Sequence, residues 1–113
     1  MPKLTSQQVI ADAMSEADLL RNVTELAHGL GYTVAHIRDS RRQMVEGYPD
    51  LVIAGHARLI HVELKVENES KGKLSPWQER WRTLILSAQH EYYLWRPSDW
   101  LSGEIEMVLK ERR

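Results

Sequence analysis

The residues whose types and spacing point to chemistry lie between Gly47 and Lys65. This stretch contains Asp50, a first apolar run, a turn at 55–58, a second apolar run and then Glu63. Two short runs rich in β-branched residues around a Gly-containing turn predict a β-hairpin. The hairpin would bring acidic residues that are distant in the sequence onto neighbouring strands.

A hairpin that is symmetric about this turn places two acids opposite each other. With His56 and Ala57 at the tip, Asp50 faces Glu63, and Lys65 shares the sheet face of Glu63. Opposed carboxylates repel unless a proton or a cation lies between them. Because Mg²⁺ binds a few carboxylates together with water and substrate phosphate, the pattern is typical of metal-assisted phosphodiester hydrolysis. Lys65 would hold an attacking water or offset charge at a phosphate.

The motif and its flanks resemble a nuclease family, although a surface hairpin with ordinary charges at its ends is the structural alternative. Pro49-Asp50 followed by Glu63–Lys65 resembles the PD-(D/E)XK signature of restriction-endonuclease-like nucleases. Gly47–Leu51 (Gly-x-Pro-Asp-Leu) and Leu74–Gln78 (Leu-Ser-Pro-x-Gln) are similar to its VRR-NUC branch. The resemblance covers roughly residues 15–99.

This resemblance implies a metal site built around the hairpin. Asp50 and Glu63 would hold one or two Mg²⁺ or Mn²⁺ ions, and the backbone carbonyl of Leu64 would be a further ligand. The resemblance also places Gln78 in the active site, where its amide would bond to a water or a phosphate. The same glutamine, three residues after Ser75, fits a helix capping box, so capping is the alternative role.

A third acid is expected from the first long helix, which begins at Ser15 with Asp18 as its capping-box partner and ends near residue 30. At about 100° per residue, Glu16 projects from the apolar face of this helix and Glu25 points away from it. VRR-NUC and related nucleases are similar in having a Glu on their first helix. Glu16 would therefore complete the metal shell, with Glu25 as the alternative. A first-turn residue favoured by the helix dipole is the structural alternative for Glu16.

Several basic residues are candidates for contacts with the DNA backbone, which position a duplex without reading its sequence. They occur before the hairpin, in the charged segment after it and on the following helix. A solvated surface is the alternative explanation for all of them. The candidates are Arg38, Arg41, Arg42, Lys71, Lys73 and Arg80.

The remaining elements predict an α/β fold with a restriction-endonuclease-like core. A strand at 32–37, the hairpin, a helix from Ser75 to about 88 and a strand at 91–95 follow the first helix. This α-β-β-β-α-β order gives a mixed sheet of about four strands flanked by helices, because a crossover helix leads to a parallel strand. The helix spacing predicts a buried face of Trp77, Trp81, Leu84, Ile85 and Ala88.

The 113 residues are expected to form a single domain, with a core at about 15–99 and peripheral segments at 1–14 and 100–113. A short helix is possible in the first segment, and a helix is favoured over a strand at 104–113. The net charge of −1 weighs against nucleic-acid binding, since DNA-binding domains usually have a basic excess. There is no Cys, which excludes disulfides and thiol chemistry. Neither a membrane-spanning stretch nor a signal-peptide core is recognisable, so an intracellular protein is expected.

Together these features predict a metal-dependent DNA endonuclease. The resemblance implies structure-selective cleavage of branched DNA such as Holliday junctions by a homodimer, and it makes a phage or bacterial origin plausible. Three alternatives stay open. They are a nuclease subunit active only within a larger replication or repair complex, a non-catalytic DNA-binding module of the same fold, and an interaction domain with structural carboxylates.

Overall fold

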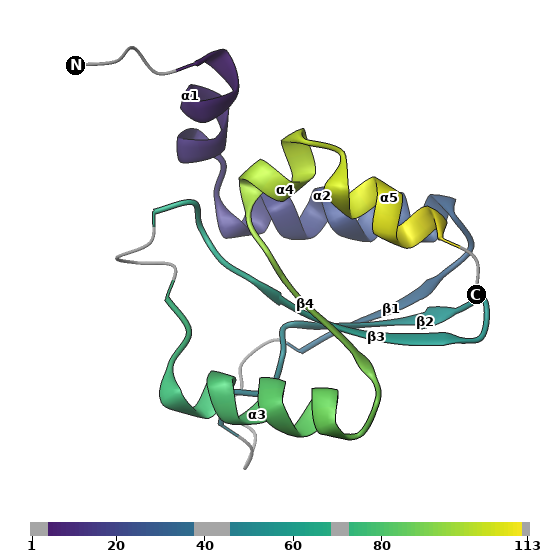
Figure 1. Ribbon diagram of the computed structural model, residues 1–113. Helices are drawn as coiled ribbons and strands as arrows, with labels where there is room; N and C mark the ends of the chain where they lie inside the picture. Colours follow the sequence, from purple (N-terminus) through teal and green to yellow (C-terminus); the bar gives the residue numbers. More distant parts are fainter. Residues whose placement is uncertain (1–4, 38–45, 69–72, 112–113) are drawn as a thin grey trace.

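The computed structural model describes residues 5–37, 46–68 and 73–111 (Figure 1). Within these ranges, no helix has both the length and the apolar character needed to cross a membrane. The elements, in chain order, are α1 (Ser6–Ala13), α2 (Glu16–Gly29), β1 (Thr33–His36), β2 (Leu51–Gly55), β3 (Arg58–Leu64), α3 (Pro76–Ser87), β4 (Glu91–Trp95), α4 (Pro97–Leu101) and α5 (Glu104–Lys110).

The strands form one mixed sheet in the order β1-β2-β3-β4. The β1–β2 and β2–β3 pairs are antiparallel, whereas β3 and β4 are parallel and joined through α3. Figure 1 shows α2, α4 and α5 over one face of the sheet and α3 over the other. The predicted α/β class and four-stranded mixed sheet with flanking helices are confirmed.

The hairpin has the register expected from the sequence, with Leu51 opposite Val62 and Ile53 opposite Ile60. Its tip is formed by His56 and Ala57, whose φ values of 50° and 61° are those of a two-residue hairpin turn. The His56 ring lies 2.7 Å, through Nε2, from the carbonyl oxygen of residue 30. The tip is thereby fixed against the end of α2, which fixes the register of the acids at the other end.

The apolar core lies between the sheet and the α2–α5 layer. It includes alternate side chains of β2 and β3, because successive residues of a strand point to opposite faces. The core also extends past the range of 15–99 expected from sequence, since α5 contributes to it and is not peripheral. Its buried residues include Leu19, Val23, Ala27, Leu51, Ile53, Ile60, Val62, Leu64, Trp95, Ile105, Val108 and Leu109.

The buried face predicted for α3 is wrong in most positions. Trp77 is 51% exposed and Leu84 is 44% exposed, and Ala88 is also exposed. Trp81 is half-buried, and Ile85 is the buried residue of this helix. Apolar spacing shows which residues share a helix face, but it does not show how much of that face another element covers. Here α3 lies over a sheet face whose buried residues are partly polar, and Ile85 is the side chain that it buries.

Arg58 links the hairpin to the C-terminal helix at the end of the sheet opposite Glu63. Its buried guanidinium pairs with Glu91, through Nη2–Oε1 at 2.7 Å and Nε–Oε2 at 2.9 Å. Its Nη1 also donates to the Tyr32 hydroxyl and to the Val108 carbonyl. A buried, bidentate charged pair of this kind fixes geometry as well as contributing energy.

Candidate functional site

Asp50 lies immediately before β2 and is fastened to the neighbouring strand. Its Oδ2 accepts a hydrogen bond of 2.8 Å from the backbone N–H of Leu64. Its own carbonyl accepts one of 2.8 Å from the N–H of Ile37, which follows β1. Asp50 is therefore held from both sides, with its carboxylate directed to the end of β3 that contains Glu63.

Glu63 is the buried acid of the site, with only 3% of its surface exposed. Its Oε1 accepts a 3.1 Å hydrogen bond from Nε2 of Gln78, whereas Oε2 is buried and has no hydrogen-bond partner. Burial raises the pKa of Glu63 most, to about 9, followed by the charge of the Asp50 carboxylate and by the hydrogen bond that the protonated acid makes with Asp50. Lys65 lowers this pKa and Glu16 raises it. The predicted residues therefore surround one carboxyl group.

Glu16 reaches this site from the first turn of α2. The residue is exposed overall, but partial burial of its carboxyl raises its pKa, and the Asp50 carboxylate raises it further. Lys65 and the backbone N–H of Val66 act in the opposite direction and lower this pKa. Glu16 thus faces the end of β3, whereas Glu25 is an exposed residue further along α2. Glu16 therefore lies within the electrostatic reach of Asp50 and Lys65, and its role as a metal ligand stays a prediction.

Gln78 caps α3 and also bonds to the candidate site, although its partner there is Glu63 and not the water or phosphate that the resemblance implies. Its Oε1 accepts a 2.8 Å hydrogen bond from the N–H of Ser75, and the Ser75 hydroxyl accepts one from the N–H of Gln78. The same amide donates through Nε2 to Glu63. Because the cap uses the oxygen and the acid uses the nitrogen, the two roles do not compete. The cap fixes which atom of the amide faces Glu63.

The segment that leads to Asp50 is clamped against α3. The Glu46 carbonyl accepts a 3.0 Å hydrogen bond from Nε1 of Trp81, and the Tyr48 ring packs edge-on against the Trp81 ring. Gly47, with φ +82°, approaches the backbone of Trp77 so closely that a Cβ there would lie 2.5 Å from its carbonyl carbon. Gly47 therefore lets Asp50 and Gln78 be brought together.

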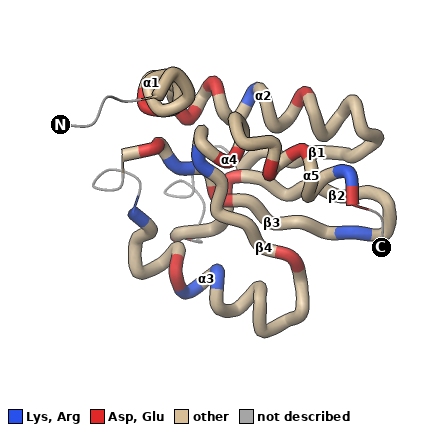
Figure 2. The backbone as a smooth tube through the Cα atoms, turned by 45° about the horizontal axis from the view of Figure 1, so that its top comes forward, with Lys and Arg blue, Asp and Glu red and all other residues tan. Residues whose placement is uncertain are grey.

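The predicted DNA-contacting residues are only partly within the described structure. Arg38, Arg41, Arg42 and Lys71 lie outside the described residues. Figure 2 shows acidic and basic segments interspersed along the described backbone, with both on α3. The two candidates that the structure places are Lys73, exposed before α3, and Arg80, exposed on α3.

Tyr92 is a residue of this region that the sequence analysis did not single out. It lies on β4 beside β3 and its hydroxyl is buried without a hydrogen-bond partner. The sequence feature that could have identified Tyr92 is its place in a pair of adjacent tyrosines, Tyr92-Tyr93, within a predicted core strand. Adjacent strand residues point to opposite faces, so one tyrosine had to face α3.

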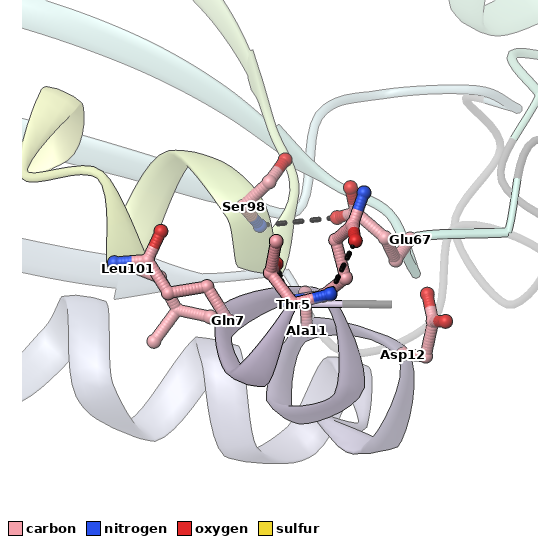
Figure 3. Close-up of a pocket in the computed structure, with 8 residues that line it drawn as sticks. Thr5, Gln7, Ala11, Asp12, Glu67, Ser98 and Leu101 are labelled. Carbon is pink, nitrogen blue, oxygen red and sulfur yellow. Dashed lines mark hydrogen bonds between the residues drawn. The ribbon is translucent and has the colours of Figure 1, made fainter. Parts of the chain in front are cut away.

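A separate pocket of about 330 Å³ lies between α1, α4 and the segment after β3 (Figure 3). Glu67 lines it and accepts a 3.0 Å hydrogen bond from the N–H of Ser98. None of the predicted metal ligands lines this pocket. Its other lining residues are Thr5, Gln7, Gln8, Ala11, Asp12 and Leu101.

The donor set at the end of β3 fits a hard divalent cation. In the described ranges, no three His, Asp or Glu side chains form a ready-made group for a metal ion. Glu63 nevertheless presents a buried Oε2 that no group donates to, beside the Asp50 carboxylate. Mg²⁺ and Mn²⁺ suit oxygen donors, and Mg²⁺ usually binds through one or two carboxylates while keeping several waters. The Leu64 carbonyl as a ligand stays a prediction.

Comparisons of the chain with protein-family models, with curated proteins and with solved structures find no match. The similarity to VRR-NUC nucleases therefore remains a prediction from the motif residues. What the structure adds is placement, since Glu16, Asp50, Lys65 and Gln78 all interact with Glu63 or with its neighbours.

We expect Gly47→Ala to disturb the site through its backbone. The alanine would combine a positive φ with contact against the Trp77 backbone, so the free energy of unfolding should fall by more than about 1 kcal/mol. Mn²⁺ affinity should fall as well, because Asp50 follows in the same segment. Urea denaturation and calorimetric titration measure the two effects.

The matched control for this substitution is Gly29→Ala, since a Cβ at that position has nothing within 4 Å. Alanine there should leave Mn²⁺ affinity unchanged and keep or slightly raise stability. If the two substitutions changed stability and Mn²⁺ affinity equally, the packing of Gly47 on Trp77 would not be what positions Asp50.

We expect Glu63→Gln to stabilise the metal-free protein at alkaline pH. The folded-state pKa of Glu63, about 9, lies above its ordinary value of 4.5, so the folded state binds the proton more tightly. Its contribution to stability is therefore fully present below about pH 4.5 and is lost as pH rises toward 9. Glutamine cannot ionise, so the variant should gain over wild type across that window. Denaturation in EDTA at pH 5 to 8.5 measures the free energy of unfolding of both proteins. A difference between them that does not change with pH would contradict the prediction.

Proposed function

We propose that this protein is a metal-dependent DNA endonuclease that hydrolyses phosphodiester bonds. The observation that supports this best is the buried Glu63, whose Oε2 has no partner, beside the anchored Asp50 carboxylate. A buried acid next to another acid is costly unless a proton or a cation compensates it. A divalent cation would neutralise the two carboxylates and would also serve in phosphodiester hydrolysis.

Each residue of the site has a distinct role in this proposal. Asp50 and Glu63 would hold Mg²⁺ or Mn²⁺, with Glu16 and the Leu64 carbonyl completing the shell. A bound divalent ion lowers the pKa of its water and offsets negative charge at the phosphate. The N–H of Leu64 keeps the Asp50 carboxylate in place.

Lys65 and Gln78 act beside these acids. Lys65 interacts electrostatically with both Glu63 and Glu16, and in this proposal its ammonium faces the approaching water or phosphate oxygen. In that position it orients the water or offsets charge that develops on the phosphate. Gln78, fixed by its cap to Ser75, orients Glu63 through Nε2.

Branched DNA, such as a Holliday junction, is the substrate proposed from the VRR-NUC resemblance. One site of this kind cuts one strand. Cutting both strands of a junction therefore needs two sites, which a homodimer would provide.

The exposed apolar residues favour a second candidate, a nuclease subunit that is active only within a larger complex. Trp77 is 51% exposed next to Gln78, and Val9 and Ile10 on α1 are also about half exposed, at 53% and 51%. These side chains are accessible to a partner protein. A partner bound near Trp77 would lie against the catalytic end of the sheet.

We expect Mg²⁺- or Mn²⁺-dependent cleavage that Lys65→Ala lowers by about 100-fold or more, since one charge-stabilising group removed from an active site costs about this much. The assay compares linear duplex, flap and four-way-junction DNA on gels. Lys110→Ala is the matched control, because Lys110 is exposed on α5 and pairs with Glu106. This variant should cleave like wild type.

The possible outcomes separate the two candidates. Cleavage of the junction in preference to the duplex, lost in Lys65→Ala, agrees with the stand-alone enzyme. A folded protein that binds Mn²⁺ but cuts none of these DNAs agrees with the partner-dependent subunit. Cleavage that Lys65→Ala leaves intact would contradict the proposed site.

A further inference from the structure

Tyr92 and Tyr93 are adjacent on β4 and point to opposite faces of the sheet. Tyr93 stacks on Trp95, a residue of the apolar core, and its hydroxyl donates a 3.0 Å hydrogen bond to Glu91. Tyr92 points to the α3 face and is 8% exposed. Its hydroxyl is buried and has no hydrogen-bond partner.

The position of Tyr92 beside β3 brings it to the acids. In the parallel register, Tyr92 pairs with His61, and the next residue of β3 on the same face is Glu63. Among the described residues, the Tyr92 hydroxyl and Glu63 Oε2 are the two buried side-chain atoms without a hydrogen-bond partner. An unpaired buried polar atom is costly for stability. The two unpaired atoms belong to neighbouring strands and to the same face of the sheet, so we consider them together.

A tyrosine hydroxyl is a hydrogen-bond donor at neutral pH, and the charged groups around the Tyr92 hydroxyl come from both α3 and the hairpin. Burial raises the pKa of Tyr92 most, followed by the Glu63 carboxylate, while Arg82 lowers it and Glu79 and Asp50 raise it. Glu79 and Arg82 belong to α3, and Glu63 and Asp50 belong to the hairpin. The hydroxyl therefore lies beneath α3 within the electrostatic field of the candidate metal ligands.

We propose that Tyr92 is a positioning residue of the metal site, whose hydroxyl donates to Oε2 of Glu63 through one bridging water. A carboxylate oxygen has two lone-pair sites, so Oε2 can accept this bond and still bind a cation. Gln78 orients Oε1 from α3, and Tyr92 orients Oε2 from β4. Hydrogen-bonding partners of this kind commonly tune the affinity of a metal ligand. The inference rests on the metal site of the proposed function.

The test is the affinity of the full chain for Mn²⁺, measured by isothermal titration calorimetry for wild type and Tyr92→Phe. This substitution removes one oxygen and keeps the ring, and we expect about 10-fold weaker binding. Tyr93→Phe is the matched control, because it removes a hydroxyl from the opposite face, and its Mn²⁺ affinity should equal that of wild type. Thermal unfolding in EDTA confirms that both variants are folded.

Three results would overturn the inference, and they differ in what else they affect. In the first, Tyr92→Phe binds Mn²⁺ as tightly as wild type and is at least as stable without metal. The Tyr92 hydroxyl would then be an unpaired group with no role in metal binding, and the proposed function would be unaffected. Equal weakening in Tyr93→Phe would show that the effect is not specific to the site. Absence of Mn²⁺ binding by the wild type would overturn both the inference and the proposed function.

Discussion

The structure depends on one constraint, which is the burial of the Glu63 carboxyl beside Asp50. Most of the surrounding architecture serves to hold these two groups together. The hairpin register sets them on neighbouring strands, the Leu64 N–H fixes Asp50, and the capped Gln78 binds Glu63. Close packing of Gly47 on Trp77 joins the segment before Asp50 to the helix that presents Gln78. Such preorganisation of charged groups is costly for stability and is typical of functional sites.

The two faces of the sheet differ in polarity, and the candidate site lies on the polar one. On the α2–α5 face, apolar side chains form a continuous core, and Arg58 secures the C-terminal helix at the hairpin-tip end. On the α3 face, the buried residues include His61, Glu63 and Tyr92 as well as Ile85. His61 lies 3.2 Å through Nδ1 from the Glu91 carbonyl and stacks on the neighbouring His90. The apolar core on one face thus stabilises a sheet whose other face contains the buried acid Glu63.

Much of the site could be predicted from sequence because its signals are local. A strand period of two and a short turn fix the Asp50–Glu63 opposition, and the helical phase of Glu16 directs it to the hairpin. Capping patterns located the starts of α2 and α3. The exposure of Trp77 and the core role of Ile105 depend on which elements meet in space, and no local pattern contains that information. Tyr92 was missed for the same reason, since its significance comes from the register of β4 on β3.

The most direct test of the metal site is the anomalous diffraction of crystals grown with Mn²⁺. We predict a peak between the Asp50 and Glu63 carboxylates, about 2.1 Å from an oxygen of each, with Oε2 of Glu63 as a ligand. Saturating Mn²⁺ with no peak at these carboxylates, or with a peak only elsewhere, would contradict the site. In that case Glu63 would be a buried acid that keeps its proton, and the case for a nuclease would lose its physical basis.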